Sequence, residues 1–102
     1  MKPPADCVTK QDIRSEIDRL DRELIRLLVE RFSYVQRMAQ LKQDPDDAYV
    51  QERIDDVLDK VAAKAEEAGL DPALVREMWA KLIDWNIEYE RTTIASRKSG
   101  KP

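Results

Sequence analysis

The sequence contains no histidine, one cysteine and two glycines among its 102 residues. Without histidine the chain cannot build a Ser-His-Asp or Cys-His catalytic group, nor an imidazole acid–base catalyst. Zinc sites made of histidines or of clustered cysteines are excluded as well. Gly69 and Gly100 lie far apart in the sequence, so neither a P-loop nor a dinucleotide-binding turn can form. An enzyme of this composition works with Arg, Lys, Asp and Glu, which suits the binding and polarisation of an anion.

The remaining absences concern location and partners. The single cysteine, Cys7, cannot form an intrachain disulfide, which fits a reducing compartment. No apolar run approaches the ~20 residues of a membrane span, and the first residues lack the apolar core of a secretion signal. Lys and Arg number 18 against 21 Asp and Glu, and this net charge of -3 argues against nucleic acid as a partner. We therefore predict a cytoplasmic protein that binds neither membrane nor nucleic acid.

The apolar residues that are present recur at steps of three and four, which is typical of amphipathic helices. A first helix is predicted from about residue 10 to about residue 42, because Thr9 and Asp12 resemble a capping box and no proline follows before Pro45. Such a helix is about 50 Å long, far longer than a usual globular helix of ~11–12 residues. A chain this small cannot easily cover it, so we expect a partner chain.

Two further helices are predicted. Residues 43–48 form a polar loop, and a second helix spans about 49–67, with Gly69 placed to end it. Asp71-Pro72 has the chemistry of a helix start, and the third helix runs to about residue 94.

These elements give an all-α chain of three helices, of which the first is very long. We predict a single helical domain over residues 1–102. Its ends are predicted to be irregular, with an extended arm at residues 1–8, where prolines oppose a helix, and a flexible tail at residues 95–102.

Polar residues at apolar positions of the first helix are candidates for binding. The spacing 31, 35, 38, 42 places Arg31 and Lys42 on the apolar face, about 16 Å apart along the helix. A buried cation without a partner is costly, so each requires an anion. A small dianion lying against the helix would serve both. The alternatives are that Arg31 pairs with an internal glutamate and that Lys42 reaches water at the helix end.

The third helix repeats this pattern. Asn86 and Glu90 continue the line of Trp79 and Ile83 at steps of three and four. The alternative is that this line drifts, so that Glu90 is exposed and pairs with a surface arginine. Arg53 opens the second helix just before its apolar face, and a solvated arginine is the alternative there.

Arg14 lies near the start of the first helix and is separated from Arg31 by 17 positions, about 25 Å along a helix. No ligand of metabolite size touches both within one chain. If Arg14 serves the same site, it must come from an antiparallel second subunit.

Three segments resemble the all-helical, type II chorismate mutase family: DIRSEIDRLDRELIRLLVERFSYVQRMAQLK, QERIDDVL and AGLDPALVREMWAKLI. They cover nearly the whole chain, and the start, with Met1-Lys2, Pro4 and Asp6-Cys7, resembles the isochorismate pyruvate lyase branch. The resemblance implies an intertwined homodimer of three-helix subunits with two equivalent sites for a small dianionic substrate.

The family reaction is a pericyclic rearrangement of chorismate to prephenate, which the resemblance makes the expected activity. It requires no metal, cofactor or nucleophile, and catalysis comes from holding the reactive conformer and stabilising charge on the breaking C–O bond. The alternatives are an isochorismate pyruvate lyase, which yields salicylate and pyruvate, and a non-catalytic helical dimer that serves as an interaction module.

The resemblance also implies roles for the cations. Arg14 of the partner chain and Arg31 would clamp the substrate carboxylates, because a guanidinium group binds a carboxylate bidentately. Lys42 would contact the ether oxygen and a carboxylate, and Arg53 would add a cation at the mouth of the site.

Departures from the family pattern bear on the choice of substrate. Glu90 stands where many bacterial members have a glutamine that donates to the ether oxygen. A carboxyl group can donate there only when it carries a proton. The resemblance also implies that Asn86, at a neighbouring position, contacts the substrate. Val50 and Ile54 occupy positions at which typical mutases carry acids. The loss of these acids favours the lyase branch. Glu90 favours a mutase, because it resembles the glutamate that the fungal mutases use at this position.

Overall fold

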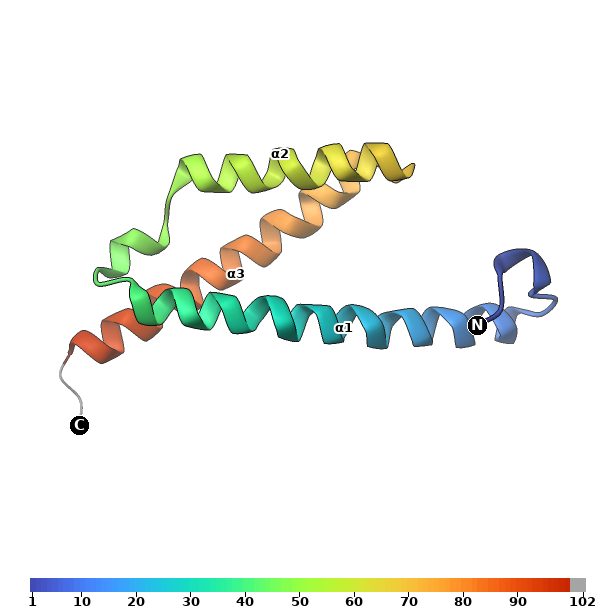
Figure 1. The fold of residues 1–102 in the computed structure, drawn as a ribbon, viewed down its shortest axis with the longest axis horizontal. Coiled ribbons are helices and arrows are strands. Elements are labelled where there is room, and N and C mark those ends of the chain that lie inside the picture. Colours follow the sequence, from blue (N-terminus) through green and yellow to red (C-terminus); the bar gives the residue numbers. More distant parts are fainter. Residues whose placement is uncertain (100–102) are drawn as a thin grey trace. The chain divides into compact units, whose positions relative to one another are not determined.

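The structure is a computed structural model that describes residues 1–99. Its elements follow one another along the chain as η1 (Pro4–Asp6), α1 (Lys10–Leu41), η2 (Pro45–Ala48), α2 (Gln51–Ala68) and α3 (Pro72–Lys98), where η denotes a 3-10 helix (Figure 1). Residues 1–99 contain three α-helices and no strand, which confirms the predicted all-α class. The chain divides into two compact units, an N-terminal unit of Met1–Tyr34 and a C-terminal unit that begins at Val35.

The start of α1 is the predicted capping box. The Asp12 backbone N–H donates to Thr9 Oγ1 at 3.0 Å, and Asp12 Oδ2 accepts from the backbone N–H groups of Val8 at 3.0 Å and Thr9 at 3.3 Å. These contacts satisfy N–H groups that have no partner inside the helix. The Val8 N–H, together with the Lys2 ammonium at 3.4 Å, holds the pKa of Asp12 below its ordinary value.

This lowered pKa predicts an acid-sensitive start of α1. Asp12 binds its proton less tightly in the folded state than in the unfolded state. Its contribution to the free energy of unfolding is therefore present above the ordinary pKa of 3.8 and is lost as the pH falls through the lower pKa of the folded state. We expect Asp12→Asn to lower the melting temperature at neutral pH and to match the wild type in strong acid. Melting curves followed by circular dichroism between pH 7 and pH 2 measure this, and a pH-independent difference would contradict it.

The arm at residues 1–8 is not wholly extended, which corrects the prediction. Pro4 opens the 3-10 turn η1, a position where the missing proline N–H costs nothing, and the Cys7 N–H donates to the Pro4 carbonyl at 3.1 Å. The arm curls back beside the start of α1 (Figure 1). Together with α1 it lines a half-open pocket of about 430 Å³. The wall of this pocket is mostly apolar and includes Met1, Pro3, Cys7, Ile13, Ile17 and Leu20.

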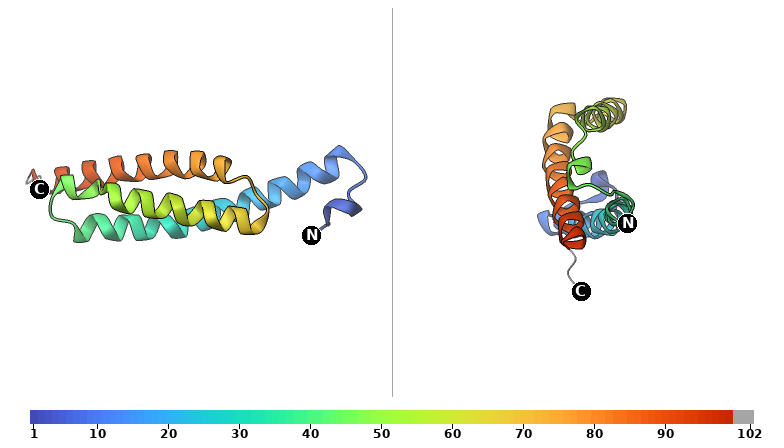
Figure 2. Two further views of the ribbon diagram at one scale, coloured as in Figure 1. Left: turned by 90° about the horizontal axis from the view of Figure 1, so that it is seen from above. Right: turned by 90° about the vertical axis from the view of Figure 1, so that its left-hand side faces the viewer.

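In the C-terminal unit α2 packs alongside α3 (Figure 2). Gly69 ends α2 with φ 83°, a left-handed conformation that glycine adopts without strain, as predicted. Asp71 begins α3 by accepting a hydrogen bond from the Ala73 N–H at 2.9 Å, with Pro72 at the first helical position. The core of this unit is small and consists of Ala39, Ala48, Ala62, Ala65, Val75, Ile83 and Ile94.

The segment predicted as a polar loop contains a helical turn, η2. The Asp44 side chain caps it by accepting from the Asp46 N–H at 2.9 Å, and Pro45 occupies the first position. Ala48 is buried, and η2 packs against α3. The turn forms because its short polar residues satisfy the backbone locally while one small residue faces the core.

The last helix is longer than predicted. α3 continues to Lys98, so residues 95–98 are helical instead of belonging to a flexible tail. Ile94 is fully buried and Arg97 donates to the Ala39 carbonyl at 2.8 Å, and these contacts stabilise the final turn. Residues 100–102 of the predicted tail lie outside the described residues.

Among the described residues, no helix is both long enough and apolar enough to span a membrane.

Candidate active site

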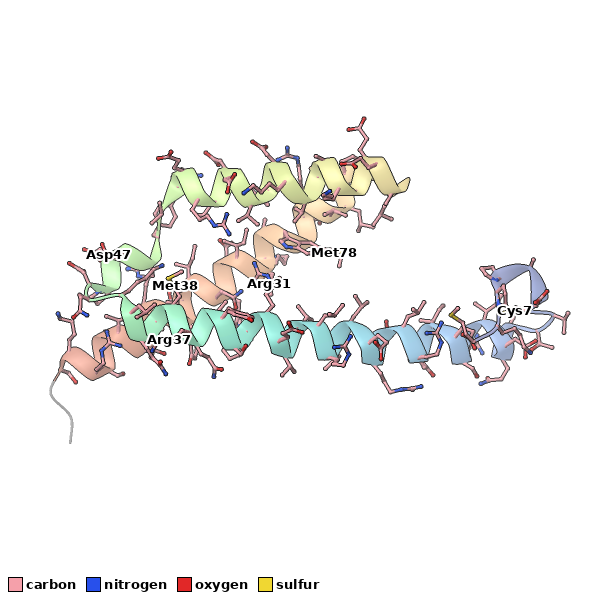
Figure 3. All side chains as sticks on the ribbon, viewed as in Figure 1. Cys7, Arg31, Arg37, Met38, Asp47 and Met78 are labelled. Atoms are coloured by element: carbon pink, nitrogen blue, oxygen red, sulfur yellow. The ribbon has the colours of Figure 1, made fainter. Side chains whose placement is uncertain are left out.

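A lysine and a glutamate from distant parts of the chain meet in the C-terminal unit. Lys42 follows the last residue of α1, and its ammonium group donates to Glu90 Oε1 on α3 at 2.7 Å. The Lys42 N–H still donates to the carbonyl of Met38, one turn earlier and labelled in Figure 3, at 3.0 Å. The lysine is therefore held by its main chain in helical geometry while its side chain reaches α3.

Both groups of this pair are largely buried. The side chain of Lys42 is 21% exposed and that of Glu90 is 10% exposed. An ion pair removed from water interacts more strongly than one at the surface, and loss of either partner leaves a costly buried charge. The alternatives that Glu90 is exposed and that Lys42 simply reaches water are therefore wrong for the described structure.

This pairing also corrects one argument made from the sequence. The spacing of Lys42 on an apolar face required an anion, and we expected a bound dianion to supply it. In the structure the chain supplies that anion itself, as Glu90. The charge of Lys42 is therefore compatible with the non-catalytic helical dimer as well as with an enzyme.

Asn86 lies one helical turn before Glu90 on α3, as predicted, and it is buried. Every buried side-chain nitrogen or oxygen of the described residues has a hydrogen-bond partner. The line of Ile83, Asn86, Glu90 and Ile94 therefore forms the buried face of α3, with polar groups in its middle.

Arg53 lies at the start of α2 and takes the solvated geometry that was the alternative for it. Its Nη1 is 2.6 Å from Asp56 Oδ2, and its side chain is 65% exposed. Lys60 contacts the same carboxylate at 3.0 Å, and the hydrogen bonds from Lys60 and Arg53 lower the pKa of Asp56. Pairs this exposed contribute little to stability, so Arg53 is free of a strong structural role.

The other two predicted arginines belong to the N-terminal unit. Arg14 is exposed in the second turn of α1, and Arg31 is partly buried on the same helix, where Figure 3 labels it. Both lie on α1, and their binding of a substrate stays a prediction.

Arg97 is a residue of this region that the sequence analysis missed. Its Nη1 donates to the Ala39 carbonyl at 2.8 Å and its Nη2 donates to the Lys42 carbonyl. Ile94 and Glu90 precede Arg97 by three and seven residues on α3, a spacing that places them on one helix face. A basic residue in register with a buried glutamate was the signal that could have identified it.

The chemistry open to this region follows from its groups. A partly buried ammonium beside a carboxylate can polarise an oxygen that gains negative charge, and such preorganised charges are the main device of electrostatic catalysis. Within residues 1–99 there is no cluster of three or more Asp, Glu or Cys residues that could hold a metal ion.

Comparison with known proteins gives one family and two relatives. Residues 13–91 match the family described as chorismate mutase type II. The isochorismate pyruvate lyase of Pseudomonas aeruginosa is 36% identical over 97 residues, which is 91% of this chain and 96% of that protein. The T-protein of Haemophilus influenzae is 38% identical over 74 residues, 72% of this chain but only 20% of the T-protein.

Proposed function

The chain belongs to the chorismate mutase type II family, and on this premise we propose that it is an enzyme that rearranges chorismate to prephenate. The observation that carries the proposal is the buried pair of Lys42 and Glu90, because it supplies a fixed cation and a second polar group without histidine, metal or nucleophile. A pericyclic reaction requires no more than orientation and charge stabilisation.

In the proposed mechanism the Lys42 ammonium turns from Glu90 towards the ether oxygen of chorismate. Negative charge grows on that oxygen as the C–O bond breaks, so the ammonium stabilises the transition state more than the bound substrate. Arg31 and Arg14 of the partner chain clamp the two carboxylates of the substrate, and Arg53 adds a cation at the mouth of the site. Asn86 contributes a neutral hydrogen bond. These roles follow the family resemblance residue by residue.

The same proposal includes a homodimer in which Arg14 comes from the partner chain. It is supported by apolar residues of α1 that are each about half exposed, at Ile13, Ile17, Leu20, Leu24, Leu27 and Leu28. A contiguous apolar stripe of this length is unusual on a monomer surface, and a second long helix would bury it. The apolar pocket beside the N-terminal arm adds to the surface that a second copy would cover.

Isochorismate pyruvate lyase is the second candidate function. Two observations favour it: the lyase from Pseudomonas aeruginosa matches this chain over 96% of its own length, and neither Val50 nor Ile54 can hydrogen-bond a ring hydroxyl through its side chain. The lyase reaction also breaks a C–O bond of a dianionic substrate, so the same cations would serve it.

One experiment separates these functions. Purified protein is incubated with chorismate and, separately, with isochorismate, and prephenate is measured against salicylate plus pyruvate. We expect prephenate from chorismate as the faster reaction. Salicylate and pyruvate as the main products would establish the lyase instead. Turnover of neither compound would favour the non-catalytic helical dimer that serves as an interaction module.

Glu90→Gln tests the part that Glu90 plays. In the structure Glu90 accepts a hydrogen bond from Lys42, and a carboxylate has acceptor oxygens but no donor to offer the ether oxygen. The glutamine keeps an acceptor for Lys42 and gains an N–H donor. We therefore expect Glu90→Gln to retain kcat/KM within about tenfold or to exceed the wild type, whereas Glu90→Leu should lose about 10²-fold.

The matched control for this pair of variants is Glu88→Gln, because Glu88 is exposed on the same helix. It should leave the rate of prephenate formation unchanged. A loss in Glu90→Gln as large as that in Glu90→Leu would show that the charge of Glu90, and not hydrogen bonding, is what catalysis requires.

A further inference from the structure

Arg97 of α3 caps the C-terminal end of α1. Its guanidinium group donates to the carbonyls of Ala39 and Lys42, 58 and 55 residues earlier in the chain. Ala39 and Ile94 are both fully buried, and the guanidinium group of Arg97 links the last turn of α1 to α3 there. This contact does not depend on residues of the N-terminal unit.

The end of α1 requires such a partner for a physical reason. The last carbonyls of a helix lack donors within the helix, and the helix end carries partial negative charge. The last turn of α1 contains no basic residue of its own. A guanidinium group is planar and presents several N–H donors in fixed directions, so one arginine can hold two carbonyls at once.

The two contacts of α3 with Lys42 define where the lysine lies. Arg97 holds its carbonyl, and Glu90 holds its ammonium group at 2.7 Å. When a substrate takes the ammonium from Glu90, the hydrogen bond from Arg97 to the Lys42 carbonyl remains. We propose that Arg97 is a positioning residue that fixes the main chain of Lys42, so that its ammonium group meets the breaking C–O bond of a bound dianion at one place.

This inference rests on the proposed function, because it gives Arg97 its effect through the catalytic use of Lys42. A displacement of about 1 Å in a catalytic group can cost about 10²-fold in rate. We therefore expect Arg97→Ala to lower kcat for prephenate formation by about 10- to 100-fold, with a much smaller change in KM. Arg97→Lys retains a positive charge but cannot donate to both carbonyls in the same way. Compared with Arg97→Ala, it should therefore restore the melting temperature more fully than kcat.

The test is a double-mutant cycle with Lys42→Met. If Arg97 acts through Lys42, Arg97→Ala has no further effect on kcat in the Lys42→Met background, since the group that it positions is gone. A residue that only stabilises the fold would lower the folded fraction equally in both backgrounds. Arg91→Ala, the same substitution at an exposed site on the same helix, is the matched control and should leave kcat unchanged.

Amide hydrogen exchange, read by NMR, provides a measurement that does not depend on turnover. Arg97→Ala should speed exchange of the Lys42 N–H, which donates to the Met38 carbonyl, by at least about tenfold, while the amides in the middle of α2 stay unchanged. Unchanged exchange would overturn the inference. So would an active wild type whose kcat is the same in Arg97→Ala, or an equal loss of kcat in the two backgrounds.

The two proposals fail in different ways. A wild type that converts neither chorismate nor isochorismate overturns the proposed function, and with it the catalytic effect assigned to Arg97. The exchange measurement then still shows whether Arg97 fixes the main chain of Lys42.

Discussion

Replacing Lys42 by methionine is expected to lower kcat/KM for chorismate by about 10²- to 10³-fold, the usual cost of removing one group that stabilises transition-state charge. Methionine keeps the length and apolar stem of lysine but lacks the ammonium group. Because the ammonium acts mainly on charge that develops during the reaction, most of the loss should fall on kcat. Steady-state kinetics of prephenate formation measure this split directly.

A loss of stability must be separated from this effect. Lys42→Met leaves the largely buried carboxylate of Glu90 without its ion-pair partner, which destabilises the fold. Melting curves show whether the variant is folded at the assay temperature, and the double variant Lys42→Met with Glu90→Gln removes the unpaired charge. Lys60→Met, at an exposed lysine paired with Asp56 on α2, is the matched control. Activity within tenfold of the wild type in a folded Lys42→Met variant would contradict the proposed mechanism.

Mixing two inactive variants is expected to restore activity if the site is shared between subunits. Arg14→Ala and Lys42→Met are each nearly inactive alone. After joint unfolding and refolding, half of the dimers contain one chain of each kind. In such a dimer one site combines Lys42 of the first chain with Arg14 of the second, and the other site carries both substitutions. About a quarter of the wild-type activity should therefore return, which is a gain of more than tenfold.

The control for this experiment uses two residues proposed to serve a site from the same chain. A mixture of Arg31→Ala and Lys42→Met places one substitution in each site of the mixed dimer, so no activity should return. Recovery in both mixtures, or in neither, would contradict the donation of Arg14 across the interface. Light scattering on the wild type tests whether the chain forms a dimer, since a monomeric mass at micromolar concentration would exclude a shared site.

The local structure was predictable because it depends on near neighbours in the sequence. The capping box of Thr9 and Asp12, the left-handed Gly69 and the Asp71-Pro72 helix start all form as predicted. Each involves residues within four positions of one another, so the backbone geometry follows from the residue types. The two ends of the chain were less predictable, because η1 and the last turn of α3 depend on what packs beside them.

The site was predictable in its members but not in its arrangement. Helical periodicity placed Lys42 and Glu90 on apolar faces, and the family resemblance gave them roles. It could not show that the two side chains pair with each other, nor that the exposed Arg53 faces Asp56.

The sequence by itself determined three helices, the residues on their apolar faces, and a set of cations in a chain without histidine. These properties follow from local spacing and composition. Only the tertiary structure decided that Glu90 meets Lys42 across 48 residues and that Arg97 closes the end of α1 across 55. Contacts of that separation depend on the turns at Pro45 and Gly69, which set how α3 returns to the end of α1, and no spacing along one helix encodes that return.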